Sequence, residues 1–543
     1  MATPLSVVRD VQDALIRYID TAFWIKDPGI RDERRELLTR EGVLLREPLL
    51  EPVLPYDGTV PALDACVEAS LLPSEAHLLI DALFRCDDPS VFKLRSHQAE
   101  SLAMALAGGH PWNPVVTAGT GSGKTEAFLL PVLARLLMES RSWTQASDST
   151  QPWWTGNRWE PSRRESRPAA MRTMVLYPMN ALVEDQVARL RRALRRIRAA
   201  GGPTIWFGRY TSATHGGTKN PVEARNRAHV AQVAQEIRAM QSEFDRLGTL
   251  SEADLAQFPD PRVGEMVTRW DMWATPPDIM VTNYSMLNVM LMRQLEQPIF
   301  EKTRRWLESD PGHVFTLVVD ELHLYRGTQG AEVGMILRNL INRLGLSADS
   351  SQLRIIGTSA SMDESGGQFL ERFFGVPRST FDIIGGQPRE LRPDGSADEQ
   401  PVDLALALAC RDDEGQYRAA RLSTVRDRLG WTDERMVEAL TSLETPRVGQ
   451  IPFRTHIFAR GIRGLWACSN PECSEILHPR LESGIGRLYT LPREFCECGS
   501  RVLALLVCRV CGDCSFAGYR IGSFDGGHYV GATVRFSHQA PRM

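Results

Sequence analysis

The chain has 543 residues, with 43% hydrophobic and 24% charged side chains, which is typical of a globular protein of about three domains. Its formal net charge of −4 argues against binding nucleic acid through bulk positive charge, although a local basic channel is compatible with it. No apolar run approaches the ~20 residues needed to cross a bilayer, and the N-terminus lacks a signal peptide's apolar core. We therefore expect a cytoplasmic protein without a membrane partner.

In chain order, residues 1–90 mix helical patterns with a proline-rich middle, which predicts an accessory N-terminal domain. From 91 to 385, short apolar strands rich in Val, Ile and Thr alternate with helices. This alternation predicts an α/β fold, an open parallel sheet with helices on both faces. Two polar stretches, 142–168 and 215–270, are expected to be surface insertions. The arginine-rich helix at 187–200 is expected to turn its arginines to solvent, with a patch for nucleic acid or a partner as the alternative.

The C-terminal part divides into three segments. Residues 386–402 have the composition of a linker. Residues 403–450 predict a helical, winged-helix-like segment, because two short helical patterns follow each other and Thr432 can cap the second. Residues 451–543 hold most of the ten cysteines of the chain and form a cysteine-rich module. Clustered thiols in a reducing compartment indicate metal binding more than disulfides.

The stretch AGTGSGKT at 118–125 follows an apolar strand and precedes a helix, which is the context of a phosphate-binding loop. Its glycines let backbone amides face inward and wrap phosphates. Lys124 would reach the β- and γ-phosphates, and Thr125 would bind Mg²⁺. The candidate nucleotide ligands in this loop are Gly119, Thr120, Gly121, Ser122, Gly123, Lys124, Thr125 and Glu126.

The stretch TLVVDELHLY at 316–325 supplies the acidic partner of this loop. Asp320 would hold Mg²⁺ directly or through water, and Glu321 would polarise the attacking water. His323 would couple the nucleotide site to other motifs. The sequence has no NKxD-like motif of the kind with which GTPases read their base.

Residues 91–385 resemble the first RecA-like lobe of a superfamily-two DExH-box helicase, because further motifs follow in the order and spacing of that family. They are LRSHQAESL (94–102, Q motif), LYPMNALVEDQ (176–186, motif Ia), GRYTS (208–212, motif Ic), TNYSMLNVML (282–291, motif Ib) and GTSAS (357–361, motif III). The resemblance implies a P-loop NTPase that uses ATP and Mg²⁺. It implies that Gln98 hydrogen-bonds the edge of the adenine base and that Phe92 is a candidate to stack on this base.

The same resemblance assigns nucleic-acid contact to motifs Ia, Ib and Ic, whose short polar groups and backbone amides suit phosphates. The residues concerned are Pro178, Asn180, Thr211, Ser212, Thr282, Asn283 and Tyr284. The alternative for any one of them is an ordinary turn at the end of a strand. Ser359, Ala360 and Ser361 of motif III would couple the ATP state to the grip on the strand.

Helicases of this family use a second lobe, which supplies arginines to the γ-phosphate. Residues 386–543 contain no QxxGRxGR-like motif, and the nearest string, GIGRLY at 484–489, lies inside the cysteine module. We therefore expect the second RecA-like lobe to be absent from this chain. It would come from a C-terminal part of a longer protein or from a partner subunit, and the chain alone would hydrolyse ATP weakly or not at all.

The cysteine spacing indicates a structural zinc site. Cys468-x4-Cys473 and Cys496-x-Cys498 are paired thiols at short spacing, and we assign one tetrahedral Zn²⁺ to these four. Cys508 and Cys511 are the runner-up pair, which would either replace one pair or start a second site. An all-thiolate set favours a closed structural site over a catalytic one.

The module around HIFARGIRGLWACSNPEC (456–473) resembles the zinc-bearing insert between the lobes of large helicases in bacterial anti-phage defence systems such as Druantia and DISARM. Related DNA-repair helicases place their cysteines differently. The resemblance implies an ATP-dependent DNA helicase or translocase of phage defence or DNA repair, acting on single-stranded DNA or a duplex junction. The alternatives are an RNA helicase and a nucleotide-gated nucleic-acid-binding subunit with little ATPase of its own.

Overall fold

The structure is a computed structural model, in which the chain divides into two units, Pro55–Arg389 and the combined segments Met1–Leu54 and Glu390–Met543. The residues that the structure describes are 4–86, 88–119, 121–143, 152–156, 158–248, 250–262, 264–325, 327–362, 366–393, 400–443, 447, 449–462, 464–481, 484–522 and 528–531. Thr120 of the predicted phosphate loop lies outside them. No helix within these ranges is both long and apolar enough to cross a membrane.

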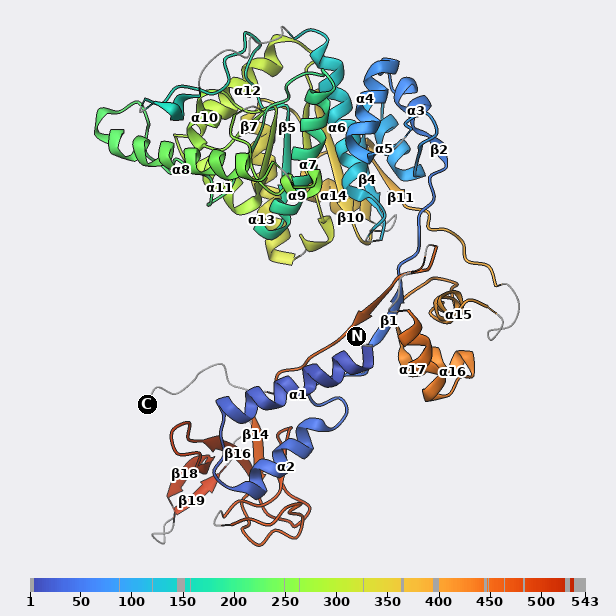
Figure 1. Ribbon diagram of the computed structural model, residues 1–543. Helices are drawn as coiled ribbons and strands as arrows, with labels where there is room; N and C mark the ends of the chain where they lie inside the picture. Colours follow the sequence, from blue (N-terminus) through green and yellow to red (C-terminus); the bar gives the residue numbers. More distant parts are fainter. Residues whose placement is uncertain are drawn as a thin grey trace. The chain divides into compact units, whose positions relative to one another are not determined.

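The unit Pro55–Arg389 is built on one sheet whose neighbouring strands are all parallel (Figure 1). The order across the sheet is β11-β4-β10-β9-β5-β8-β6-β7. The strands are β4 (Asn113–Thr117), β5 (Thr173–Tyr177), β6 (Phe207–Tyr210), β7 (Glu265–Met266), β8 (Ile279–Asn283), β9 (Phe315–Val319), β10 (Leu353–Ser359) and β11 (Phe381–Gly385). The predicted parallel sheet is confirmed.

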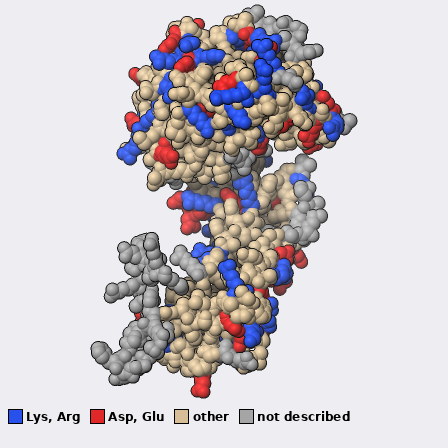
Figure 2. All heavy atoms as spheres, turned by 90° about the vertical axis from the view of Figure 1, so that its left-hand side faces the viewer, with Lys and Arg blue, Asp and Glu red and all other residues tan. Residues whose placement is uncertain are grey.

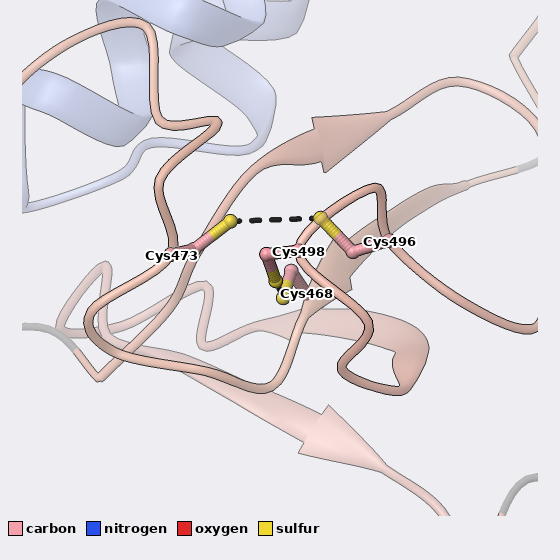
Figure 3. Close-up of side chains that lie close together, drawn as sticks. All are labelled: Cys468, Cys473, Cys496 and Cys498. Carbon is pink, nitrogen blue, oxygen red and sulfur yellow. Dashed lines mark hydrogen bonds between the residues drawn. The ribbon is translucent and has the colours of Figure 1, made fainter.

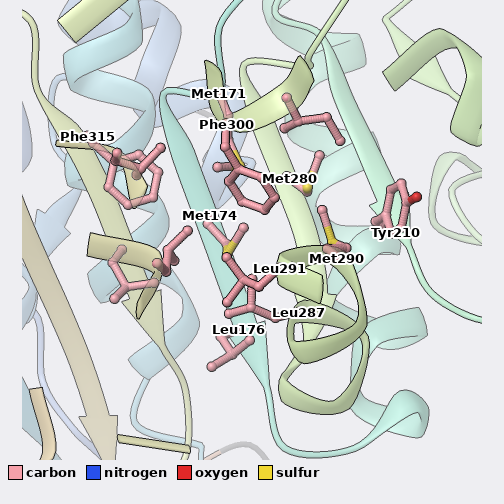
Figure 4. Close-up of a cluster of buried hydrophobic side chains, with 14 of the residues drawn as sticks. Met171, Met174, Leu176, Tyr210, Met280, Leu287, Met290, Leu291, Phe300 and Phe315 are labelled. Atoms are coloured by element: carbon pink, nitrogen blue, oxygen red, sulfur yellow. The ribbon is translucent and has the colours of Figure 1, made fainter. Parts of the chain in front are cut away.

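The sheet carries a hydrophobic core on each face, because successive side chains of a strand point to opposite sides. In β5, Met174 and Leu176 belong to one core, and Val175 and Tyr177 belong to the other. Figure 4 shows part of the first core, where Met174 and Leu176 lie among methionine, leucine and phenylalanine side chains. Its main helices are α8 (Arg227–Arg246), α10 (Arg269–Ala274), α11 (Tyr284–Met292), α12 (Gln297–Ser309), α13 (Gly327–Arg343) and α14 (Gly366–Phe374).

The second core includes a segment that we expected elsewhere. Its helices are α3 (Ala62–Glu68), α4 (Pro73–Phe84), α5 (Ser96–Leu106), α6 (Lys124–Ser140) and α7 (Asn180–Ala199). Residues 55–90 were expected in the accessory domain, but they lie in the sheet unit. The reason is apolar burial, because Leu79 and Ile80 of α4 are fully buried in the same core as Phe128 and Leu130 of α6.

The two interruptions of the sheet pattern, 142–168 and 215–270, pack against each other. The first contributes the short helix η1 (Trp153–Thr155), and the second contributes α8. Trp154 Nε1 donates to Gln241 Oε1 at 2.9 Å, and Arg238 donates to the Trp154 carbonyl at 2.7 Å. The second interruption also supplies the edge strand β7. Its end is therefore part of the sheet and not only a surface insertion.

Three of the six arginines of α7, namely Arg191, Arg195 and Arg196, bind this second interruption, contrary to the expectation that they face solvent, whereas Arg198 is exposed. Arg191 is 4% exposed and pairs with Glu265 of β7 at 2.7 Å. Arg195 donates to the Leu255 carbonyl at 3.1 Å, at the end of α9 (Glu252–Leu255). A guanidinium and a carboxylate are buried together here because each neutralises the other.

Within the described residues, the other unit contains three small antiparallel sheets and helices from both ends of the chain. The smallest sheet pairs β18 (Tyr519–Gly522) with β19 (His528–Gly531). One sheet has the order β12-β1-β13 and lies beside a group of three helices. These elements are β1 (Leu49–Pro52), β12 (Ala420–Arg421), β13 (Phe453–His456), α15 (Val402–Ala409), α16 (Leu422–Leu429) and α17 (Asp433–Ser442). Thr432 caps α17 by accepting from the Arg435 amide at 3.2 Å. The winged-helix assignment of 403–450 stays a prediction.

The second sheet forms the cysteine module and has the order β15-β14-β16-β17. Its strands are β14 (Leu465–Cys468), β15 (Leu488–Tyr489), β16 (Val502–Val507) and β17 (Cys514–Ala517). Ile25, together with Ile30 and Leu37 of α2 (Pro28–Thr39), packs into one core with Leu465 and Leu505. The N-terminal segment thus folds together with the cysteine module.

Candidate nucleotide-binding site

The predicted phosphate loop connects the buried strand β4 to the N-terminus of α6. Gly121 has φ +81° and Gly123 has φ +76°, a left-handed conformation in which a side chain is strained. A Cβ atom on Gly123 would lie 2.5 Å from Gln98 Nε2 and 2.8 Å from Arg95 Nη1, so these two side chains would have to move. Gly121 and Gly123 of the loop and Lys124 and Thr125 of the first turn of α6 line a common space, as an anion site requires.

This space is a cavity of about 600 Å³. Loop residues, both acids of the β9 motif and three aromatic side chains line it. The lining residues are Tyr56, Gly58, Phe84, Phe92, Lys93, Arg95, Gln98, Gly121, Gly123, Lys124, Thr125, Glu126, Gln186, Arg189, Asp320 and Glu321. Its volume lies within the usual range for small-molecule sites, which is about 300–1,000 Å³.

Asp320 lies at the carboxyl end of β9 and is 8% exposed. Burial raises the pKa of its carboxyl above the ordinary aspartate value, and a hydrogen bond from the Thr358 hydroxyl acts in the opposite direction. The same Thr358 oxygen accepts the Glu321 amide at 3.2 Å. Thr358 is fully buried in β10, so one side chain of the neighbouring strand holds both acidic residues.

Glu321 has φ +54° and ψ +51°, a left-handed conformation that is uncommon for a residue with a side chain. Its Oε1 atom lies 3.8 Å from Lys124 Nζ, and its Oε2 atom lies 3.2 Å from His323 Nδ1. His323 Nδ1 also accepts the amide of Ala360 at 3.3 Å. The structure therefore brings Lys124, Glu321, His323 and Ala360 into one chain of contacts.

The residues present fit a nucleoside triphosphate with Mg²⁺. Lys124 offers one ammonium, and Asp320 and Glu321 offer carboxylate oxygens on the wall of the same cavity. The Ser122 hydroxyl is buried and has no hydrogen-bond partner among the described residues. Thr125 and Glu126 line the cavity, and Glu126 pairs with Arg189 at 3.1 Å.

The two residues expected at the base also line the cavity. Phe92 packs on Phe84 with ring centroids 4.7 Å apart. The Gln98 amide is engaged by the protein, because its Nε2 atom donates to the Gly123 carbonyl at 3.2 Å and its Oε1 atom accepts the Arg95 amide at 3.1 Å. Gln98 therefore fixes the position of the phosphate loop in this structure.

The candidate nucleic-acid residues follow three adjacent strands, β5, β8 and β6, at their carboxyl ends. Some of their side chains are used within the protein. Thr282 is fully buried and donates to the Tyr210 carbonyl at 2.7 Å. Asn283 caps α11 by accepting the Met286 amide at 2.8 Å, and Gln329 donates to the Tyr284 hydroxyl at 3.0 Å.

Other candidates at this edge are more open. Pro178 is half-buried and Ser212 is exposed, whereas Thr211 is 4% exposed and its carbonyl accepts from Arg269 at 2.8 Å. The Asn180 side chain lies outside the described part of the chain. In motif III, Ser359 is buried and its hydroxyl donates to the carbonyl of the exposed Ser361 at 3.2 Å.

Charged side chains of both signs are interspersed over the face of the sheet unit shown in Figure 2. This mixture agrees with the net charge of −4. Bulk positive charge is therefore no basis for nucleic-acid binding on that face.

The sulfur atoms of Cys468, Cys473, Cys496 and Cys498 lie within 4.8 Å of one another (Figure 3). Two pairs of sulfurs, Cys468 with Cys498 and Cys473 with Cys496, are 3.5 Å apart. A tetrahedral zinc with bonds of about 2.3 Å places its sulfurs about 3.8 Å from each other, so this set fits Zn²⁺.

The surroundings of the four cysteines also suit a metal site. Hydrogen bonds from the amide and hydroxyl of Ser500 lower the pKa of the Cys498 thiol to about 6, which favours the metal-binding thiolate, whereas burial raises the pKa of the Cys468 and Cys473 thiols. Gly486, which belongs to the GIGRLY string at 484–489, packs against Cys468 and Cys473. A Cβ atom on it would lie 2.7 Å from Cys473 Cβ.

Cys508 and Cys511, the runner-up pair, are exposed and lie outside this group of four. Backbone amides of Cys511 and Val510 lower the pKa of the Cys508 thiol. The Cys511 thiol contacts Asp513 Oδ2 at 3.2 Å. The pair does not replace either of the two pairs in the group of four.

Sequence reasoning missed three residues of the site, Tyr56, Arg95 and Thr358. The Tyr56 hydroxyl accepts the Gly119 amide at 3.1 Å, and Arg95 donates to the Gly121 carbonyl at 3.1 Å. Tyr56 precedes the phosphate loop by more than sixty positions and carried no motif signal. Thr358 stands inside the recognised string GTSAS, so that string was the signal for it.

Comparison with known proteins agrees with this geometry. Residues 95–213 match the family model of the DEAD/DEAH box helicases. The chain is also 28% identical to the Druantia protein DruE of Escherichia coli (strain UMEA 4076-1), in a match that covers 95% of the chain. It spans 33% of the length of that relative.

Among solved structures, the chain is similar to the DUF1998 helicase MrfA bound to DNA, with 17% identity and a TM-score of 0.34. That match covers 73% of this chain and 43% of MrfA. It is also similar to the DEAD-box helicase Mss116 bound to ssRNA and UDP-BeF, with 14% identity, a TM-score of 0.35 and coverage of 62% of this chain and 47% of Mss116.

Proposed function

We propose that the chain is the ATP-binding part of an ATP-dependent DNA helicase or translocase that serves bacterial phage defence or DNA repair. The observation that carries this proposal is the cavity in which Lys124, Asp320 and Glu321 meet beside the glycine-rich loop. The helicase-family match over residues 95–213 includes the loop and motifs Ia and Ic.

Each residue of the cavity has a role in this proposal. Lys124 and the loop amides bind the phosphates, while Thr125 and Asp320 hold Mg²⁺, which neutralises charge on the transferred phosphoryl group. Glu321 orients and polarises the attacking water. The ammonium of Lys124 lies 3.8 Å from Glu321 Oε1, so phosphate bound at the loop would compete with that carboxylate for it.

Turnover by the chain alone is proposed to be weak. Among the described residues, the sheet of the unit Pro55–Arg389 is the only parallel one, and it supplies one lobe. Arginines that reach the γ-phosphate from a second element contribute about 10³–10⁵ in rate in related phosphoryl transfer. A second lobe, from the same longer protein or from a partner subunit, would supply them.

DNA is the proposed polymer, bound as a single strand or a duplex junction at the carboxyl ends of β5, β6 and β8. The DELH tetrad at 320–323 and the cysteine module favour DNA over RNA. The role in defence is supported by the similarity to the Druantia protein DruE, which extends over the cysteine module as well as the helicase domain.

The test is to measure nucleotide binding and ATP hydrolysis by the purified chain, with and without single-stranded DNA or RNA. We expect Mg²⁺-dependent binding that Lys124→Ala abolishes, and slow hydrolysis. Lys219→Ala, which changes an exposed lysine of the same unit, is the matched control and should bind as the wild type does. Equal binding by Lys124→Ala and the wild type would refute the proposed site.

The measurements with DNA and with RNA distinguish the proposed DNA helicase from an RNA helicase and from a nucleotide-gated binding subunit. Stimulation by RNA and not by DNA would identify an RNA helicase. Nucleotide-dependent DNA binding without any hydrolysis, even when a second lobe is added, would identify a nucleotide-gated binding subunit. Rapid DNA-stimulated hydrolysis by the chain alone would show that no second lobe is needed.

A further inference from the structure

Tyr56 lies against the phosphate loop although it comes from a distant part of the sequence. Its hydroxyl accepts the Gly119 amide at 3.1 Å, where β4 passes into the loop. Its carbonyl accepts Arg95 Nε at 3.2 Å, and Arg95 continues to the Gly121 carbonyl at 3.1 Å. His97 packs edge-on against the Tyr56 ring, with centroids 5.9 Å apart. Tyr56 is thus bonded to the loop both directly and through Arg95.

The residues next to Tyr56 tie together the two places where the chain enters and leaves the sheet unit, which spans Pro55–Arg389. Asp57 accepts two hydrogen bonds from the Arg389 guanidinium, one of them at 2.8 Å from Nε. The Arg389 amide donates to the Pro55 carbonyl at 2.8 Å. We call Pro55, Asp57 and Arg389 the clasp.

The segment that leads from β11 to Arg389 also contacts the start of the loop. The Gly386 amide donates to the Thr117 carbonyl at 2.7 Å, at the end of β4. A Cβ atom on Gly386 would lie 2.6 Å from Ala118 Cβ and 3.0 Å from the Tyr56 ring, so these groups are in close contact. The residues at 117–119 therefore contact both Tyr56 and Gly386.

We propose that Tyr56 is a positioning residue, which holds the start of the phosphate loop and transmits the nucleotide state of the cavity to the clasp. Tyr56 itself lines that cavity. Phosphate that binds the loop amides fixes the loop, and the Gly119–Tyr56 bond fixes the clasp in turn. The inference rests on the proposed nucleotide site and adds a route from that site to both connections of the chain.

The experiment compares the wild type with Tyr56→Phe, which keeps the ring and removes the hydroxyl. Titration with a fluorescent ATP analogue and Mg²⁺ should show affinity about 3- to 10-fold weaker, the effect of one lost hydrogen bond. Hydrogen exchange should show that nucleotide slows exchange of the Gly386 and Arg389 amides in the wild type and not in Tyr56→Phe. Tyr18→Phe, an exposed tyrosine of the other unit, is the control and should behave as wild type.

A second variant, Asp57→Asn, separates the clasp from the loop. It should keep the nucleotide affinity of the wild type and lose the nucleotide-dependent protection of Arg389. If Tyr56→Phe matches the wild type in both affinity and exchange while Lys124→Ala does not bind, the role of Tyr56 is refuted and the nucleotide site stands. If the wild type and Lys124→Ala bind equally, the nucleotide site itself is refuted.

Discussion

At the scale of single residues, one hydroxyl organises the acidic pair of the site. Thr358 lies on β10, directly beside β9, and parallel pairing places it next to the end of the acidic strand. Its hydroxyl donates a hydrogen bond to Asp320, and the same oxygen accepts one from the Glu321 amide. A threonine can do both because a hydroxyl has one donor and two acceptor positions. The left-handed backbone of Glu321 is held in part by this contact.

We predict that Thr358→Val, which keeps the shape and removes the hydroxyl, lowers the rate constant of ATP hydrolysis about 10-fold or more in the assembled enzyme. The expected cause is loss of the Asp320 and Glu321 positions, with an unsatisfied buried amide as a further cost. Single-turnover hydrolysis and nucleotide affinity, measured separately, check the prediction, because affinity should change less than the rate.

Thr358→Ser is the matched variant, since it restores the hydroxyl and should recover most of the rate. A Ser variant as slow as the Val variant would mean that packing of the Thr358 methyl group, and not the hydrogen bonds, sets the rate.

At the scale of elements, a buried ionic cluster attaches the first interruption to the sheet. Asp278, just before β8, is fully buried and accepts hydrogen bonds from Arg163, Arg167 and Arg172 at 3.2, 2.9 and 3.0 Å. Burial raises the pKa of the Asp278 carboxyl, but the three guanidinium groups outweigh it and hold this pKa below the ordinary aspartate value. The cluster joins residues 163–172 to the amino end of β8.

We predict that Asp278→Asn lowers the free energy of unfolding of the sheet unit by about 3–5 kcal/mol at pH 7, because it leaves buried arginines without their carboxylate. The folded-state pKa is depressed, so the contribution of Asp278 is present above the unfolded-state value of about 3.9 and is lost as the pH falls through the lower folded-state value. Urea unfolding at several pH values should show the difference from wild type shrinking on acidification. Glu308→Gln, which breaks an exposed pair with Arg304, should cost about 0–0.5 kcal/mol.

The cysteine module gives a prediction about metal content. Purified protein should contain about one tightly bound zinc, which Cys498→Ala loses and which Cys508→Ala retains, because Cys508 lies outside the group of four sulfurs. Elemental analysis of both variants is the measurement. If only Cys508→Ala lost zinc, the metal would have to be assigned to the pair of Cys508 and Cys511.

The sequence predicted the elements whose pattern is local and missed the contacts that join distant segments. Buried apolar runs such as TMVLY identify strands by themselves, and the spacing of the four cysteines along the sequence is enough to predict a metal site. Tyr56 gives no such signal, because only the folded chain brings it beside Gly119, which lies far from it in the sequence. The arginines of α7 look solvated in a helical pattern, and only the fold brings Glu265 to Arg191.

At the scale of the whole molecule, the nucleotide cavity and the cysteine group belong to different units. We predict two separable thermal transitions in calorimetry. A non-hydrolysable ATP analogue at about 100 times its dissociation constant should stabilise only the sheet unit, by about 2.7 kcal/mol. A zinc chelator should lower only the other transition. One transition that responds to both additives would show that the units unfold together.

The division of the second unit between Met1–Leu54 and Glu390–Met543 has a consequence for how the protein is made. During synthesis, β1 emerges early, but its partners in the ladder, Ala420 and Thr455, emerge only after the whole sheet unit. Closing a flexible loop of several hundred residues costs on the order of 5 kcal/mol, and prior folding of Pro55–Arg389 removes most of this cost by bringing Pro55 and Arg389 together. Co-translational folding should therefore start in the sheet unit, and the N-terminal segment should remain open to chaperones until its partners at 420–505 have left the ribosome.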